Sequence, residues 1–131
     1  MPDLAVFVLR FGLGVMFTAH GLQMAFALFG GGGVKGFSEM LSGLGFAAPL
    51  LWAYVAAYVV LAGGLCLIVG LFTRAASFLL IIFMAVAIAK VHFSKGFFIT
   101  NGGYEYNFVV ISALIALMMA GPGKYSILER L

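Results

Sequence analysis

Charged residues are scarce in this sequence. Only 8% of the 131 residues are charged, whereas 65% are apolar, and the mean hydropathy is +1.22. In a typical soluble domain about a quarter of the residues are charged. Water cannot solvate such an apolar chain as a globule, so the composition excludes a soluble domain and indicates a protein whose main solvent is lipid.

Cysteine is almost absent as well. Cys66 is the single cysteine, so the chain can form no internal disulfide and no internal two-cysteine redox pair. A lone thiol inside an apolar run is typical of a small packing residue. The few cations lie near the ends of apolar runs, so the net charge of +3 indicates contact with lipid headgroups and not with nucleic acid.

Long apolar runs are what the sequence does contain. Because a bilayer core about 30 Å thick needs about 20 apolar residues per helix, we expect transmembrane helices at about 4–29, 50–72, 75–93 and 106–120. Apolar residues at 34, 37, 41 and 44 recur every three or four positions, which predicts a short amphipathic helix at about 34–44. The sequence therefore predicts one all-α domain over 1–131, an integral membrane four-helix bundle with an interfacial helix between its first two spans.

The topology follows from the number of spans and the positions of the cations. Four spans place both termini on one side of the membrane. That side carries Arg10, Arg74, Lys124 and Arg130, and the opposite side carries Lys35, Lys90 and Lys95. The excess of cations favours cytoplasmic termini.

Polar side chains interrupt the apolar runs, where an ionisable group costs about 2.5 kcal/mol or more at the bilayer centre. On the expected topology the outer ends of the four helices carry His20 and Gln23, then Trp52, Tyr54 and Tyr58, then Lys90 and His92, and then Glu105 and Asn107. All four helices therefore deliver polar groups to one depth, beneath the interfacial helix. Lys90 and His92 are two residues apart, about 200° around an α-helix, so at most one should easily face the interior.

Three interpretations of this outer cluster stay open. The first is interfacial anchoring together with a satisfied polar network. The second is an organic ligand site, for which the candidate residues are His20, Gln23, Tyr58, His92, Glu105 and Asn107. Imidazole can hydrogen-bond a quinone carbonyl, and a carboxylate can accept a quinol proton. The third, a metal site, ranks lowest because no helix carries paired HxxxH or ExxH spacing, so we expect no metal and no intrinsic cofactor.

Three cations are assigned structural roles: Arg10, Arg74 and Lys90. Lys90 can snorkel to the headgroups. Arg10 lies one to two turns inside its span and has three candidate partners, which are the headgroups, Glu129 and a carbonyl of the C-terminal tail.

Three segments resemble a known family. "LRFGLGVMFTAHGLQ", with Arg10, Gly14, Phe17, His20, Gly21 and Gln23, is similar to the opening helix of the DoxX family of small membrane proteins. The second helix resembles that family through Gly63, Gly64, Gly70, Leu71, Thr73 and Arg74. The closing half does so through His92, Gly96, Phe97, Gly103, Glu105, Tyr106, Gly121, Pro122, Gly123 and Ser126. The sequence departs from the family at 58–61, where many members carry a glutamate and this chain carries none.

The resemblance implies a four-helix bundle in the cytoplasmic (inner) membrane of a prokaryote, and it favours His92 over Lys90 as the residue that faces the interior. Some members resemble the membrane subunit of a thiosulfate:quinone oxidoreductase, which implies a quinone-linked redox accessory subunit. Its expected partners are the lipid bilayer, a quinone, and a partner oxidoreductase or further copies of the chain. One alternative is a structural or assembly protein without catalysis, so whether the chain is an enzyme stays open. A small transporter is less favoured, because no carboxylate lies between Leu4 and Phe29.

Overall fold

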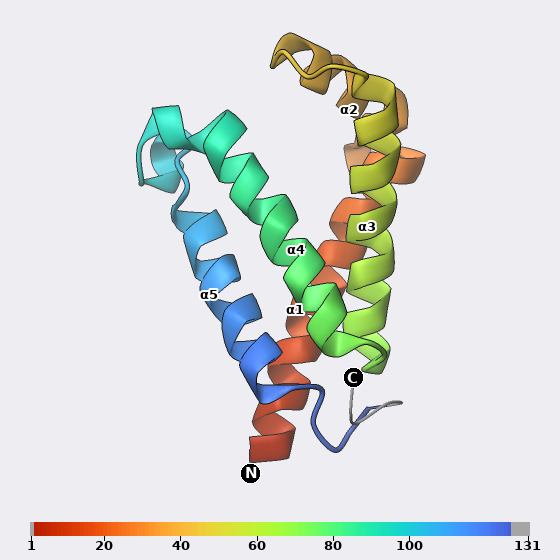
Figure 1. The fold of residues 1–131 in the computed structure, drawn as a ribbon, viewed down its shortest axis with the longest axis vertical. Helices are drawn as coiled ribbons and strands as arrows, with labels where there is room; N and C mark the ends of the chain where they lie inside the picture. The colour runs from red at the N-terminus through yellow and green to blue at the C-terminus, as the bar shows by residue number, and fades with distance from the viewer. Residues whose placement is uncertain (1, 127–131) are drawn as a thin grey trace.

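The structure is a computed structural model that describes residues 2–126. Every regular element in that range is a helix. The four long helices are α1 (Pro2–Phe26), α3 (Pro49–Val69), α4 (Thr73–Ala87) and α5 (Glu105–Ala120). The short helix α2 (Gly33–Gly43) lies at one end of the bundle, here called the upper end (Figure 1). The predicted all-α membrane bundle is confirmed.

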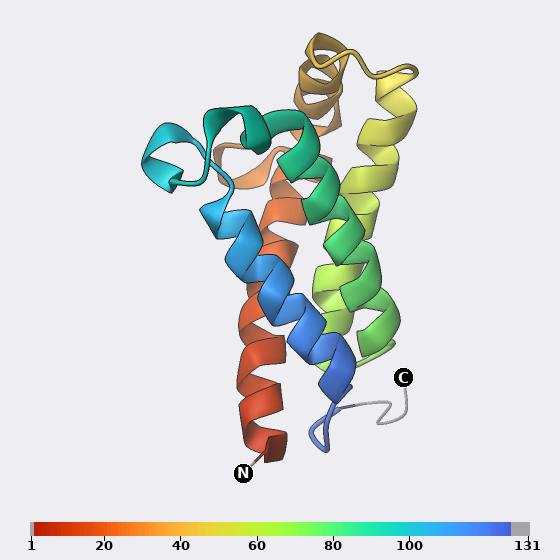
Figure 2. The same ribbon diagram turned by 60° about the vertical axis from the view of Figure 1, so that its left-hand side comes forward.

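Three helical segments are long and apolar enough to cross a membrane: Pro2–Phe26, Pro49–Val69 and Thr73–Lys95. The third exceeds α4 because a π-helix, Ile88–His92, and a 3-10 turn, Phe93–Lys95, continue it. The fourth predicted span corresponds to α5, which has 16 residues and is about 24 Å long. It runs beside α4 for most of its length (Figure 2). The chain is therefore a multi-pass membrane protein.

Local sequence sets the ends of α3. Pro49 occupies its first turn, where the missing N–H costs nothing. Gly70 ends the helix with a φ of +78°, a left-handed conformation that glycine adopts without strain. Because α4 begins at Thr73, the link between the two helices is so short that they must form an antiparallel hairpin.

Glycine brings α1 and α3 into close contact. A Cβ atom added at Gly21 would lie 2.5 Å from the Cα of Leu61, and one added at Gly64 would lie 2.5 Å from the backbone nitrogen of Thr18. In lipid, helices associate largely through such close backbone packing. The pair α1–α3 is consequently tight, and α4 packs against α5 as a second pair.

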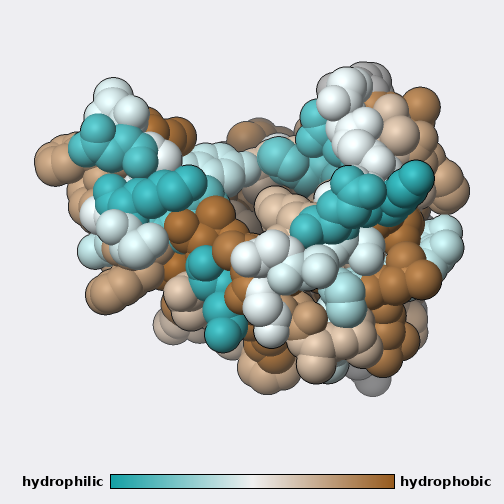
Figure 3. Space-filling view, turned by 90° about the horizontal axis from the view of Figure 1, so that it is seen from above, coloured by the Kyte–Doolittle hydropathy of each residue, from teal (hydrophilic) through white to brown (hydrophobic). Residues whose placement is uncertain are grey.

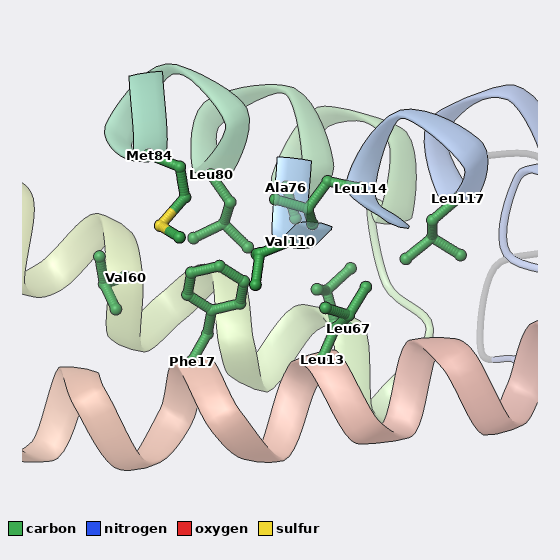
Figure 4. Close-up of a cluster of buried hydrophobic side chains, with 10 residues drawn as sticks. All are labelled: Leu13, Phe17, Val60, Leu67, Ala76, Leu80, Met84, Val110, Leu114 and Leu117. Carbon is green, nitrogen blue, oxygen red and sulfur yellow. The ribbon is translucent and has the colours of Figure 1, made fainter. Parts of the chain in front are cut away.

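The two pairs meet in a buried cluster to which all four long helices contribute (Figure 4). Its members are Leu13, Phe17, Val60, Leu67, Ala76, Leu80, Met84, Val110, Leu114 and Leu117. Toward the upper end α4 leans away from α3, as both ribbon views show (Figures 1 and 2). The bundle is thus closely packed through its lower half and spread at the top.

Candidate functional site: a cavity between the helix pairs

A cavity of about 690 Å³ occupies the spread upper half of the bundle. All five α-helices and the segments at both ends of the α4–α5 connection contribute to its wall, which is mostly apolar. Its polar lining residues are His20, Trp52, Lys90, His92, Tyr106 and Asn107. From above, hydrophilic residues lie on two raised parts of the surface with a depression between them (Figure 3). A cavity of this size, apolar with a few polar groups, is typical of a small-molecule site.

His92 is held in one orientation by the loop that follows it. Its Nδ1 lies 2.8 Å from the carbonyl oxygen of Gly102, which also lines the cavity. A carbonyl oxygen can only accept a hydrogen bond, so Nδ1 must carry the hydrogen. In the neutral imidazole Nε2 is then an acceptor, and it is the ring nitrogen left for a ligand that carries a hydroxyl group.

Lys90 also lines the cavity, although the α-helical spacing predicts that it and His92 diverge. Both residues belong to the π-helix Ile88–His92, a wider turn of a kind frequent at functional sites. The Nζ of Lys90 lies 5.8 Å from the ring centroid of Phe46, a residue of the α2–α3 loop that is also part of the wall. Lys90 therefore reaches from the α4 side of the cavity toward the α2–α3 side.

Asn107 is the most buried polar residue of the cavity wall, with 5% of its surface exposed. Its Nδ2 lies 3.9 Å from the sulfur of Met84, and a thioether is a weak acceptor. The amide thus keeps donor capacity in an apolar environment, where an unsatisfied polar group is costly. The neighbouring Tyr106 donates its hydroxyl hydrogen to the sulfur of Met16.

Three of the six candidate ligand residues lie elsewhere. Oε1 of Glu105 accepts a hydrogen bond of 2.8 Å from the amide of Ile99, so this carboxylate closes the α4–α5 connection. Tyr58 is exposed and packs against Phe26 and Tyr54. Gln23 is half-buried on α1. His20, His92 and Asn107 are the candidates that the structure brings to the cavity.

Arg10 lies at the opposite, lower end of the bundle and is 1% exposed. Its Nε donates to the carbonyl of Leu67 at 2.8 Å, and its two terminal nitrogens donate to Pro122 at 2.6 Å and Tyr125 at 2.5 Å. Tail carbonyls are among its expected partners, and they hold it here together with the end of α3. Glu129, another candidate partner of Arg10, and Arg130, one of the cations of the topology argument, lie outside the described part of the chain.

The apolar face of α2 is one part of the cavity wall that contains none of the candidate residues. Phe37, Leu41 and Leu44 line the cavity, and they are three of the four positions that define the amphipathic spacing of this helix. The amphipathic spacing of α2 is therefore a sequence signal that could have identified this part of the wall. Tyr106 and Phe46 also line the cavity, but no periodic pattern in the sequence marks either of them. Within residues 2–126, no group of three or more histidine, cysteine or acidic side chains could hold a metal ion.

Comparison with known proteins gives one match. The DoxX family model matches residues 5–93, a range that includes most of α1, the whole of α2, α3 and α4, and both histidines. Asn107 and the whole of α5 lie beyond the matched range. No curated protein matches the chain, and no solved structure does.

Proposed function

Because the chain belongs to the DoxX family, we propose that its cavity binds a quinone or quinol for a partner oxidoreductase. The observation that carries the proposal is the cavity of about 690 Å³, whose apolar wall is interrupted by a few polar groups on facing helices. Quinones dissolve in the bilayer and carry polar oxygens on an apolar ring. The wall complements both properties.

Two side chains of the wall complement the two redox forms. The Nε2 of His92 accepts a hydrogen bond from a quinol hydroxyl, because its Nδ1 is already committed to Gly102. The Nδ2 of Asn107 donates to a quinone carbonyl, because its present sulfur partner at 3.9 Å is weak. When bound, the quinone would supply exchange of two electrons and two protons with the partner protein. His92 is then the residue placed to take up or return a proton at Nε2.

The proposal places the protein in the cytoplasmic (inner) membrane of a prokaryote with both termini in the cytoplasm. In the lower half of the bundle, the amide of Lys124 donates to Asp3 at 3.2 Å, so both ends of the described chain meet there. Arg10 and Arg74 lie in the same half and supply the cationic bias expected of a cytoplasmic face. The cavity then opens in the outer half of the bilayer.

Trp52 provides a direct test, because it is the single tryptophan of the sequence and it lines the cavity. Ubiquinone and menaquinone analogues titrated into the protein in lipid nanodiscs should quench its fluorescence saturably. His92→Asn should weaken binding about 2- to 12-fold, the equivalent of about 0.5–1.5 kcal/mol for one hydrogen bond. The asparagine amide can still donate to Gly102 in the manner of Nδ1, but it offers nothing in place of Nε2.

Tyr58→Phe is the matched control, since Tyr58 lies on the same helix as Trp52 but outside the cavity. It should bind the analogues as the unmodified chain does. Quenching that rises linearly without saturation would contradict the proposal. So would a His92→Asn, Asn107→Leu double variant that binds as tightly as the original protein. Either result would leave a structural or assembly role as the better account.

A further inference from the structure

We infer that the cavity opens sideways into the bilayer between α3 and α4, and that this opening holds the hydrocarbon chain of the ligand. The inference rests on the proposed function and narrows it. The ligand class becomes a quinone or quinol that carries a long prenyl or alkyl chain, as distinct from a small water-soluble quinone.

The opening has a defined floor. A Cβ atom added at Gly63 would lie 3.1 Å from the side chain of Leu80, so α3 and α4 are in close contact at that level. Each of these residues lies about 10 Å along its helix from the short link at Gly70–Phe72. Above this contact the two helices lean apart (Figures 1 and 2).

One face of each helix lines the gap from the level of the floor upward. Trp52, Val55 and Val59 on α3, and Leu79, Ile82 and Val86 on α4, all belong to the cavity wall. Both sets are spaced by three and then four residues, the spacing of a single helical face.

The same residues show that the gap is open to the outside. All of them except Val59 keep between 42% and 49% of their surface exposed. A side chain that lines a cavity and is also half exposed lies at an opening. Since α3 and α4 are both long and apolar enough to span a membrane, this opening faces hydrocarbon and not water.

Polarity along the cavity sets the orientation of the occupant. His92 lies about 28 Å along its helical segment from Thr73, whereas Leu79 and Ile82 lie only about 9 and 14 Å from it. The polar groups are therefore at the upper end, and the apolar opening extends from that end down to Ile82 and Leu79, toward the middle of the bilayer. A ligand with its ring near His92 and its chain between α3 and α4 has the orientation of a lipid.

A hydrocarbon chain joined to the ring suits this opening best because the opening and the ring site are one continuous cavity. At the upper end of the bundle, Phe37 and Leu41 of α2 also belong to the cavity wall, so apolar side chains border the cavity there too. Apart from Trp52, the six residues at the opening offer no hydrogen-bonding side chain to a peptide or polar ligand.

The test compares two ubiquinone analogues, one with a decyl chain and one without a chain, by Trp52 fluorescence in nanodiscs. With analogue concentrations expressed per lipid, the unmodified protein should bind the decyl analogue at least about tenfold more tightly, because the chain gains packing contacts in the opening that it lacks among the lipids. A Val55→Phe, Ile82→Phe variant should remove most of this tenfold preference by filling the opening. Its affinity for the chainless analogue should change less than about twofold.

Val109→Phe is the matched control, because Val109 is 64% exposed on α5 and does not line the cavity. It should keep the preference for the decyl chain. Equal affinity of the unmodified protein for the two analogues would overturn the inference and leave the proposed function standing. Absence of saturable binding of either analogue would overturn both.

A second measurement does not depend on any variant folding correctly. A quinone with a photoreactive diazirine at the end of its alkyl chain, bound to the unmodified protein, should label peptides from residues 52–59 and 79–86. Labelling confined to α2 or α5 would place the chain elsewhere and overturn the inference. Label displaced by excess phospholipid but not by excess decyl analogue would identify a lipid acyl chain as the occupant, and would overturn it too.

Discussion

Replacing Arg10 by methionine tests what holds the lower end of the bundle together. The Arg10 guanidinium donates to three carbonyl groups, and one of them, that of Leu67, belongs to the last turn of α3. The amide that would normally reach this carbonyl is that of Leu71, which bonds instead to Cys66 at 2.9 Å. Arg10 therefore caps the carbonyl end of α3. Its positive charge also interacts favourably with the negative end of the helix dipole there.

The magnitude follows from the three acceptors. A hydrogen bond to a charged group contributes about 1.5–3 kcal/mol, so three could contribute several kcal/mol. Removing the guanidinium also recovers its desolvation cost, which opposes part of that loss. Tyr125 is exposed, so water or a headgroup can replace the donor at its carbonyl. We expect Arg10→Met to lower the free energy of unfolding by about 2–4 kcal/mol.

Arg10→Lys and Arg74→Met complete the set. Lysine keeps the charge but lacks the planar fork, so it should satisfy one or two carbonyls and lose roughly half as much stability. Arg74 is an exposed cation in the same half of the bundle, and its removal should change stability by less than about 0.5 kcal/mol.

Two assays check these values. Unfolding in mixed dodecylmaltoside–SDS micelles gives the free energies. Trypsin digestion at Lys124 reports tail release, since its amide is normally tied to Asp3. An Arg10→Met protein with the original unfolding midpoint and the original rate of cleavage after Lys124 would refute the capping argument.

Three further substitutions test the packing, the cavity and the α4–α5 connection. Gly21→Ala should destabilise the protein by at least about 2 kcal/mol in micelle unfolding, because its Cβ would overlap the backbone of α3. Gly12→Ala, at a position with nothing within 4 Å, should not, and equal effects would contradict the close-contact account. Asn107→Leu should stabilise the protein by about 1 kcal/mol, seen as a higher thermal midpoint, and yet weaken quinone binding. A variant that loses both stability and quinone binding would mean that the amide serves packing alone. Glu105→Ala should cost about 1–2 kcal/mol and speed hydrogen exchange in the connection, whereas Glu105→Gln keeps an acceptor oxygen and should lose less than half of that.

The sequence predicted the level at which polar side chains lie along the helices better than it predicted which way they point around each helix. Counting residues from the helix ends placed His20, His92 and Asn107 at one level, and the structure brings these three to one cavity. The same counting placed Tyr58 at a similar level, but its ring faces outward against Phe26. Which way a side chain points depends on which helices are neighbours, and four apolar spans of similar composition do not encode that order in any periodic pattern.

Glu105 shows a second limit of the sequence. Its partner, the amide of Ile99, lies only six residues away, in a 3-10 turn that no periodic signal predicts. The expected role of this carboxylate in a polar network or at a ligand rested on charge alone. A backbone amide competes for the same carboxylate at close range, and it is brought there by the turn between α4 and α5. The π-helix that carries Lys90 and His92 was unforeseen for a similar reason, since an α-helical count assumes one pitch throughout.

The cavity has a simple origin in the side chains that α3 presents to α4. Near the link this position is Gly63, which lets Leu80 approach to van der Waals contact. On the same side of α3, Val59 lies about one turn higher and Trp52 about three turns higher, and their bulk prevents a comparable approach. Because the link is too short to relieve this difference by sliding the helices, it is taken up as a divergence that widens toward the upper end. The polar residues of the upper end therefore border an open wedge, which leaves His92 and Asn107 accessible to the ligand proposed above.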